Sequence, residues 1–158
     1  MPPRYPVGNP PTQLSPHLFT LPGAVNCGVL VANGKCLLLD CCDNITPDRL
    51  RAFGIDTVEI GCGGFPGRAH CDPEILLSSQ KALDEFKAVF GHYGVGISAL
   101  SAHGNPVHPD KTPAATAHDH FVKACRLAQK LDIDRVITFS GCPGDHAGAK
   151  YPNWVTCP

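Results

Sequence analysis

Helical and strand-like segments alternate over residues 47–139, and this alternation constrains the fold more than any other feature of the sequence. The first predicted helix is short, beginning at Pro47 and ending at Gly54. Apolar residues at helical spacing predict two longer helices over 74–90 and 117–131. Strands separated by such helices are typical of parallel sheets, so the sequence predicts an α/β fold. The three expected strands cover residues 57–60, 95–100 and 135–139.

The loops that follow these strands are long and rich in glycine and proline, whereas the loops that precede them are short. The first such loop covers 61–73, and the second covers 103–113. In α/β folds, ligands bind at the carboxyl ends of the strands, so we expect the functional site in these loops. Arg68, in the first loop, is interpreted either as a surface arginine or as a partner for a phosphate or carboxylate.

The N-terminal part of the chain has a different pattern. Prolines are frequent in residues 1–16, which predicts a disordered lead. Two apolar, strand-like runs then flank Asn33-Gly34, a dipeptide that favours the positive φ angles of a tight hairpin turn. We therefore expect three parts: the lead, a β-hairpin segment over 17–46, and an α/β domain over 47–158.

Composition excludes several classes of function. The 13 Lys and Arg nearly balance the 14 Asp and Glu, giving a net charge of -1, without the basic excess typical of proteins that bind nucleic acid or anionic membranes. The apolar runs fall short of the roughly 20 residues of a membrane span, and no uninterrupted apolar stretch near the N-terminus resembles a secretory signal. We expect a cytoplasmic protein without nucleic-acid or membrane partners.

The 9 cysteines contain no Cys-x-x-Cys pair, the spacing typical of structural zinc sites. An odd count without a secretory signal predicts reduced thiols, several of them buried as small apolar residues. Cys142 follows the last expected strand, but no Cys/His spacing marks it as a nucleophile.

From residue 54 onward, a series of motifs occurs in a defined order. They are GIDTVEIG (54–61), GGFPGRAHC (63–71), ISALSAHGNPVHP (97–109), TFSGCPG (138–144) and YPNW (151–154). Together they resemble the sugar phosphate isomerase/epimerase family, the xylose isomerase-like TIM barrels. The resemblance covers about residues 54–158 and implies a partial (β/α)8 TIM barrel, with three parallel strands and their helices, preceded by the hairpin. It also implies a small sugar or sugar phosphate as ligand.

Five residues are candidates for contact with that ligand. His103 ends the second expected strand, where the resemblance implies contact with the sugar or, as in nuclease relatives, with a metal. His108 lies in the same loop, and His70 lies in the first loop. Strand alternation places Glu59 on the face that points into a barrel, either as a polar group under the pocket or as a salt-bridged interior glutamate. Ser140 follows the third strand, and we expect His103, Glu59 and Ser140 to line one concave surface.

The resemblance also implies a divalent metal, Mn, Mg, Co or Zn, in complete relatives, with carboxylates that move protons beside a carbonyl. Those ligands and catalytic glutamates lie mainly on later barrel strands, and His103 is the metal candidate here. We therefore expect an incomplete or chimeric chain without isomerase or epimerase turnover of its own. Open sheet edges favour pairing, so a homo-oligomer is also expected.

Two alternatives remain. Residues 17–50 resemble the opening hairpin of metallo-β-lactamase-fold hydrolases, which makes a fragment of such a hydrolase the first alternative. The string nearest to that fold's His-x-His-x-Asp-His motif ends in Asp119-His120 but lacks the first histidine. Since it lies where a helix is expected to begin, we expect Asp119 and His120 in a solvated first turn. The second alternative is a non-catalytic remnant that acts only through assembly.

Overall fold

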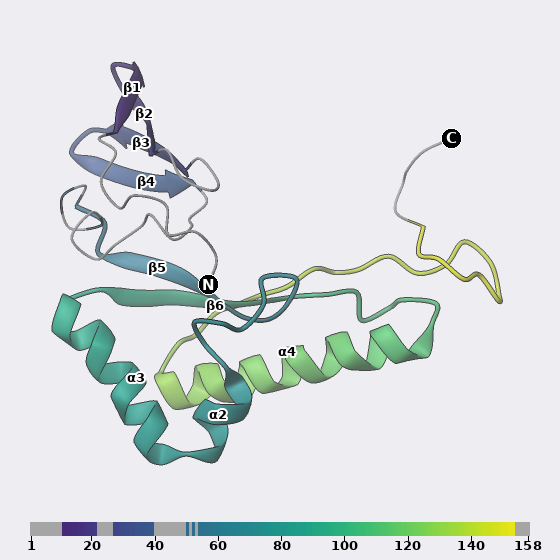
Figure 1. Ribbon diagram of the computed structural model, residues 1–158. Helices are drawn as coiled ribbons and strands as arrows, with labels where there is room; N and C mark the ends of the chain where they lie inside the picture. Colours follow the sequence, from purple (N-terminus) through teal and green to yellow (C-terminus); the bar gives the residue numbers. More distant parts are fainter. Residues whose placement is uncertain (1–10, 22–26, 40–49, 51, 53, 154–158) are drawn as a thin grey trace, which may run out of the picture. The chain divides into compact units, whose positions relative to one another are not determined.

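The computed structural model describes residues 11–21, 27–39, 50, 52 and 54–153, and the structural statements below concern these residues. They form two compact units, one built on antiparallel strands and one on a parallel sheet with helices (Figure 1). The first unit contains β1 to β4. The second contains β6, β7, the helices α2 and α4, α3 except its last residue, and β5 except its first residue.

The first unit is a four-stranded antiparallel sheet with strand order β1-β2-β3-β4. Its strands are β1 (Thr12–Ser15), β2 (Leu18–Leu21), β3 (Cys27–Ala32) and β4 (Lys35–Leu39). Asn33 and Gly34 connect β3 to β4 with φ angles of 52° and 72°, the left-handed pair of a two-residue hairpin turn. This confirms the hairpin predicted from Asn-Gly.

The predicted lead over residues 1–16 is shorter than expected. Residues 12–15 form β1, which pairs with β2, so this part of the lead belongs to the sheet. Its proline-poor sequence, TQLS, leaves every backbone N–H available for the ladder. Residues 1–10 lie outside the described residues, as does most of the short helix predicted to begin at Pro47, of which residues 50 and 52 are described as helical.

The second unit is a three-stranded sheet with order β5-β6-β7 and three helices. Its elements are β5 (Thr57–Gly64), α2 (Pro73–Ser78), α3 (Gln80–Tyr93), β6 (Gly96–His103), α4 (Lys111–Leu131) and β7 (Val136–Ile137). β7 pairs with β6 in parallel, with Leu100 opposite Val136 and Ser101 opposite Ile137. The predicted α/β unit of three parallel strands with helices is confirmed.

One hydrophobic core joins the strands and helices of the second unit. Leu100 of β6 and Leu127 of α4 are fully buried in it, beside Leu76 of α2 and Leu83 of α3. Truncating such a leucine to alanine costs about 2–5 kcal/mol because both transfer free energy and packing are lost. The core therefore fixes α4 against the sheet, and the site described below depends on that placement.

The structure divides the single helix predicted over 74–90 into α2 and α3. The residue between them, Ser79, is extended, with φ −131° and ψ 113°. Its Oγ accepts a hydrogen bond from the backbone N–H of Ala82, and Asp72 accepts one from the N–H of Glu74 in the same way. Short polar side chains compete with helical backbone bonds and favour helix starts, which is why an apolar stripe alone did not predict the break.

α4 begins at Lys111, six residues before the predicted start at Ala117. The carboxylate of Asp110 accepts a hydrogen bond from the N–H of Thr112 and so caps the helix. Pro113 fits in the first turn because its missing N–H would have no partner within the helix there. α4 has 21 residues, but none of the described helices is long and apolar enough to cross a membrane.

Burial makes two thiols of this unit unreactive. Cys62 and Cys71 are fully buried in the core, and burial raises the pKa of Cys62 to about 11 and that of Cys71 to about 12. Because the thiolate is the species that is alkylated, we expect iodoacetamide at about pH 8 to modify the exposed Cys125 at least about a hundredfold faster. Peptide mass spectrometry measures this, with labelling in urea as the control in which all three react. Equal rates in the folded chain would contradict the described core.

Candidate functional site

A cavity of about 630 Å³ lies at the carboxyl ends of β5 and β6 in the second unit. Its wall is formed by Gly64 at the end of β5 and Phe65 after it, by the end of β6 with the following loop, by the first three turns of α4, and by Pro152. This is the edge of a parallel sheet where ligands bind, and the volume is in the usual range for small-molecule sites. The side chains His103, His108 and His120 all line it.

His103 is the last residue of β6, as predicted, and its ring is held by an aromatic contact. The imidazole stacks on Phe139 with ring centroids 4.4 Å apart and planes 14° from parallel. Its Nε2 is buried and has no hydrogen-bond partner among the described residues. A buried polar atom without a partner is unfavourable, and this one belongs to a residue of the cavity wall.

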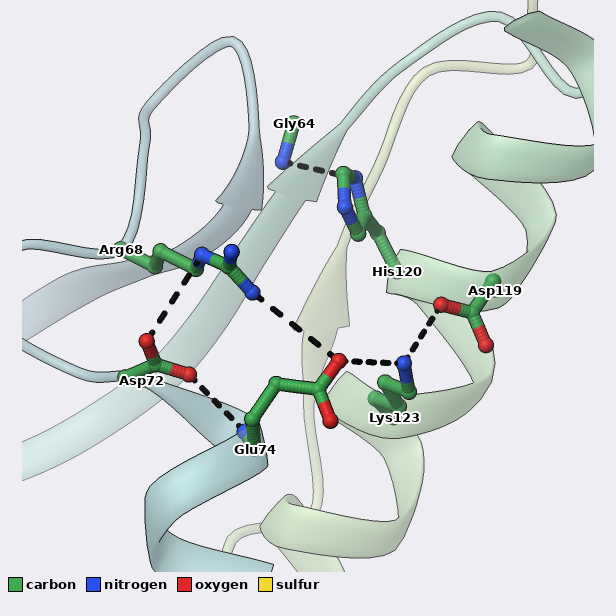
Figure 2. A network of polar contacts seen from close by, with 7 residues as sticks. All are labelled: Gly64, Arg68, Asp72, Glu74, Asp119, His120 and Lys123. Carbon is green, nitrogen blue, oxygen red and sulfur yellow. Dashed lines mark hydrogen bonds and ion pairs between the residues drawn. The ribbon is translucent and has the colours of Figure 1, made fainter.

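His120 was expected in a solvated first turn, and the structure corrects this prediction. Because α4 begins at Lys111, His120 lies in its third turn and is half-buried beside the cavity. Its Nδ1 accepts a hydrogen bond of 3.1 Å from the backbone N–H of Gly64 (Figure 2). Since an N–H donates, Nδ1 carries the lone pair, and in the neutral ring the hydrogen is on Nε2.

His108 is held in the same tautomer by its own loop. Its Nδ1 accepts a hydrogen bond of 3.0 Å from the N–H of Asp110, the residue that caps α4. Its backbone N–H donates to the carbonyl oxygen of Asn105 at 3.2 Å. His108 and His120 therefore each have Nε2–H as the remaining donor of a neutral ring.

Asn105 joins the loops that follow β6 and β7, a role that the sequence did not reveal. The side chain is buried, and its Nδ2 donates to the carbonyl oxygen of Cys142 at 2.8 Å while its Oδ1 accepts from the N–H of Cys142 at 3.0 Å. These two hydrogen bonds join residues that are 37 positions apart in the sequence. The signal available in the sequence was an asparagine two residues after a strand-ending histidine.

A network of ion pairs ties the loop after β5 to α4 (Figure 2). Lys123 of α4 contacts both Glu74 at the start of α2 and Asp119 one turn back in α4. Arg68 contacts Asp72 at 3.7 Å and Glu74 at 3.9 Å. The sequence left two interpretations of Arg68 open, a surface arginine or a partner for a phosphate or carboxylate. In the structure its side chain is half-exposed and pairs with two carboxylates of the protein itself.

The other sequence candidates lie outside the cavity. Glu59 is exposed on β5, and His70 and Ser140 are exposed in the loops after β5 and β7. Because β5 continues to Gly64, Glu59 lies five residues from the end of the strand, about 16 Å from the edge at 3.3 Å per residue. Of the three residues expected on one concave surface, the structure places His103 in this cavity and leaves Glu59 and Ser140 outside its wall.

The described residues do not fit the divalent metal that the resemblance implied. Among them, no three His, Cys, Asp or Glu side chains come together as metal ligands. Two of the three cavity histidines also use Nδ1 to accept backbone hydrogen bonds. The histidine-rich cluster required by the lactamase-fold alternative is likewise missing from this part of the chain.

The model of one protein family, described as xylose isomerase-like TIM barrel, matches residues 47–157. The chain belongs to this family. The match confirms the resemblance drawn from the motifs and begins at residue 47 rather than at 54.

Among curated proteins, the "Uncharacterized protein YfiH" of Bacillus subtilis (strain 168) is 33% identical over 104 residues. The aligned part is 66% of this chain and 33% of that protein, so the chain spans about a third of the length of this relative. No solved structure gives a significant match.

The two hydrogen bonds between Asn105 and Cys142 predict a stability effect for this member of the xylose isomerase-like TIM barrel family. In Asn105→Ala, the backbone N–H and carbonyl of Cys142 lose their side-chain partners, so we expect the free energy of unfolding to fall by about 2 kcal/mol. Urea denaturation measures the change. The control is Asn153→Ala, which changes an exposed asparagine in the segment after β7. Equal midpoints for the two variants would refute the role of these hydrogen bonds.

The ion-pair network predicts a pH dependence. The hydrogen bond from Lys123 lowers the pKa of Asp119, so the stabilisation from this carboxylate is present above the usual carboxyl pKa and is lost as the pH falls. We expect Asp119→Asn to lower the melting temperature slightly near neutral pH, because exposed ion pairs contribute little. The difference from the wild type should disappear as the pH falls through the lowered pKa of Asp119, whereas Asp134→Asn, a control on another exposed carboxylate, should show no such dependence. A difference that persists in acid would contradict this assignment.

Proposed function

We propose that this chain is a sugar phosphate isomerase/epimerase-like protein that binds a small sugar or sugar phosphate in the cavity at the carboxyl ends of β5 and β6. We further propose that its three parallel strands are a segment of a (β/α)8 barrel. The observation that carries the ligand proposal is the buried Nε2 of His103, which has no partner among the described residues. Because that atom is completely buried in the described structure, a ligand hydroxyl would supply the missing hydrogen bond only by turning the ring so that Nε2 faces the cavity.

The rest of the cavity suits a polyhydroxylated ligand. His108 and His120 each have Nε2–H as a donor, because Nδ1 of each ring is occupied by a backbone N–H. The wall also contains apolar side chains, Phe65 and Ala117 among them. Small-molecule sites typically combine such a mostly apolar wall with a few fixed polar groups that set orientation.

The side chains of the cavity wall support ligand binding more strongly than catalytic turnover. Proton transfer beside a carbonyl needs a base of suitable pKa within hydrogen-bond reach of the carbon, and this role commonly falls to a carboxylate or histidine. The described residues of the cavity wall include no carboxylate, and the Nδ1 atoms of His108 and His120 are engaged. We therefore propose that these residues recognise the ligand and do not by themselves carry isomerase or epimerase turnover.

Calorimetric titration with a panel of ketoses and ketose phosphates tests the proposed site. We expect His103→Ala to weaken binding about tenfold, the equivalent of about 1.4 kcal/mol, because one hydrogen bond is lost. The matched control is His118→Ala, which changes an exposed histidine of α4 outside the cavity wall. Full affinity in His103→Ala, or no binding of any ligand in the panel, would overturn the proposal.

The same titration separates the cavity from the other sequence candidates. His70→Ala and Ser140→Ala change exposed residues that are not part of the cavity wall, so we expect affinities within about twofold of the wild type. His120→Ala should weaken binding as His103→Ala does, since it removes an Nε2–H donor. Loss of binding in His70→Ala with retention in His120→Ala would place the ligand in the loop after β5 instead.

A further inference from the structure

The charge of the cavity wall bears on which ligands the cavity can accept. Among the described residues, the wall includes no lysine, arginine, aspartate or glutamate, and its polar side chains are three histidines, two threonines and one asparagine. Moving an anion from water to a largely apolar site is unfavourable unless a cation or several N–H donors replace its hydration. What this wall offers a phosphate group therefore depends on its N–H donors.

The backbone N–H groups of four wall residues already have acceptors within the protein. These residues are Gly64, Phe65, His108 and Thr112. Their acceptors are an imidazole nitrogen for Gly64 (Figure 2), main-chain carbonyl oxygens for Phe65 and His108, and a carboxylate for Thr112. Phosphate sites in loops and at helix starts are built from several such N–H groups that converge on the anion. In this wall, these four groups are directed at the protein itself.

The start of α4 is engaged in the same way by Asp110. The carboxylate of Asp110 accepts the N–H of Thr112 at 2.8 Å, and its carbonyl oxygen accepts the N–H of Ala114 at 3.3 Å. Pro113, between them, has no N–H to donate. The positive end of the helix dipole therefore already faces a carboxylate, which would repel a second anion placed beside it. The neighbouring cation, Lys111, is exposed and is not part of the wall.

Two histidines of the wall are held in their neutral form. The lone pair of each ring is on Nδ1, which accepts the N–H of Asp110 in His108 and the N–H of Gly64 in His120. A proton added to either ring would go to Nδ1 and would face that N–H. Protonation would therefore break a backbone hydrogen bond of 3.0 or 3.1 Å, which disfavours a positive charge that could balance a phosphate.

We propose that the cavity selects an uncharged sugar over its phosphate ester and that Asp110 is a specificity-determining residue for this preference. The Nε2–H groups of His108 and His120 are neutral donors suited to ligand hydroxyls, and two threonines add hydroxyl groups to the wall. The inference rests on the proposed function and narrows its ligand class, a sugar or sugar phosphate, to the unphosphorylated sugar.

Matched pairs of ligands that differ only in the phosphate test this preference by calorimetric titration of the full chain. The pairs are fructose with fructose 6-phosphate and ribulose with ribulose 5-phosphate. We expect the sugar of a pair to bind at least about tenfold more tightly than its ester, because the ester loses hydration without gaining a cation.

Two substitutions that alter charge separate Asp110 from the wall as a whole. Asp110→Asn keeps a side-chain oxygen that can cap α4 but removes the charge, so we expect affinity for the ester to rise about threefold and affinity for the sugar to stay within about twofold. Thr116→Lys places a cation on the wall and should reverse the preference within a pair. The control is Asp134→Asn, which removes an exposed carboxylate beyond the other end of α4 and should change neither affinity.

The possible failures distinguish this inference from the proposed function. If the wild type binds the ester more tightly than the sugar, and His120→Ala abolishes that binding, the preference for an uncharged ligand is wrong and the proposed site stands. An unchanged affinity for the ester in Asp110→Asn would refute the role of Asp110. If neither member of either pair binds, or if binding is unaffected by His120→Ala, both proposals are wrong.

Discussion

The close approach of three backbone segments at Gly64 is the constraint on which the site depends. The N–H of Gly64 donates to Nδ1 of His120, and the next N–H along the chain, that of Phe65, donates to the carbonyl oxygen of His103. Because a side chain at residue 64 would overlap that oxygen, a single glycine allows β5, β6 and α4 to meet. The tautomer of His120 and the position of Phe65 both follow from these contacts.

The ion pairs around Lys123 support this arrangement from the neighbouring surface. Each contact is partly exposed, so its individual contribution to stability is small. They connect two helices, because Lys123 lies one turn after His120 on α4 and contacts Glu74 at the start of α2. The network therefore restrains α4 relative to the loop that follows Gly64, in addition to the restraint from the apolar core.

The sequence predicted those features of fold and site that depend on local chemistry. The turn at Asn33-Gly34 follows from backbone preference, and the parallel strands follow from hydrophobic periodicity. His103 was placed at its strand end for the same reason. The position of His120 was missed because its environment depends on where α4 begins, and that start is set by a cap at Asp110, seven residues upstream of the periodic pattern.

Errors in the position of strand ends explain most of the remaining differences. Glycine-rich segments were interpreted as loop, yet pairing with a neighbouring strand carries β5 through them to Gly64. Lengthening a strand by four residues moves its carboxyl end by about 13 Å, which separates Glu59 from the cavity. Buried links between loops, such as Asn105 to Cys142, are invisible to periodicity because the partner is a backbone group distant in sequence.

The hydrogen-bonding state of the cavity histidines limits what each ring can do. Two neutral imidazoles have their Nδ1 atoms engaged and keep only Nε2–H, a donor that can bind a hydroxyl oxygen but cannot accept a proton from carbon. His103 is the exception, since its Nε2 is neither solvated nor bonded within the described residues. That buried position, held by stacking of the ring on Phe139, keeps Nε2 out of contact with the cavity until the ring turns.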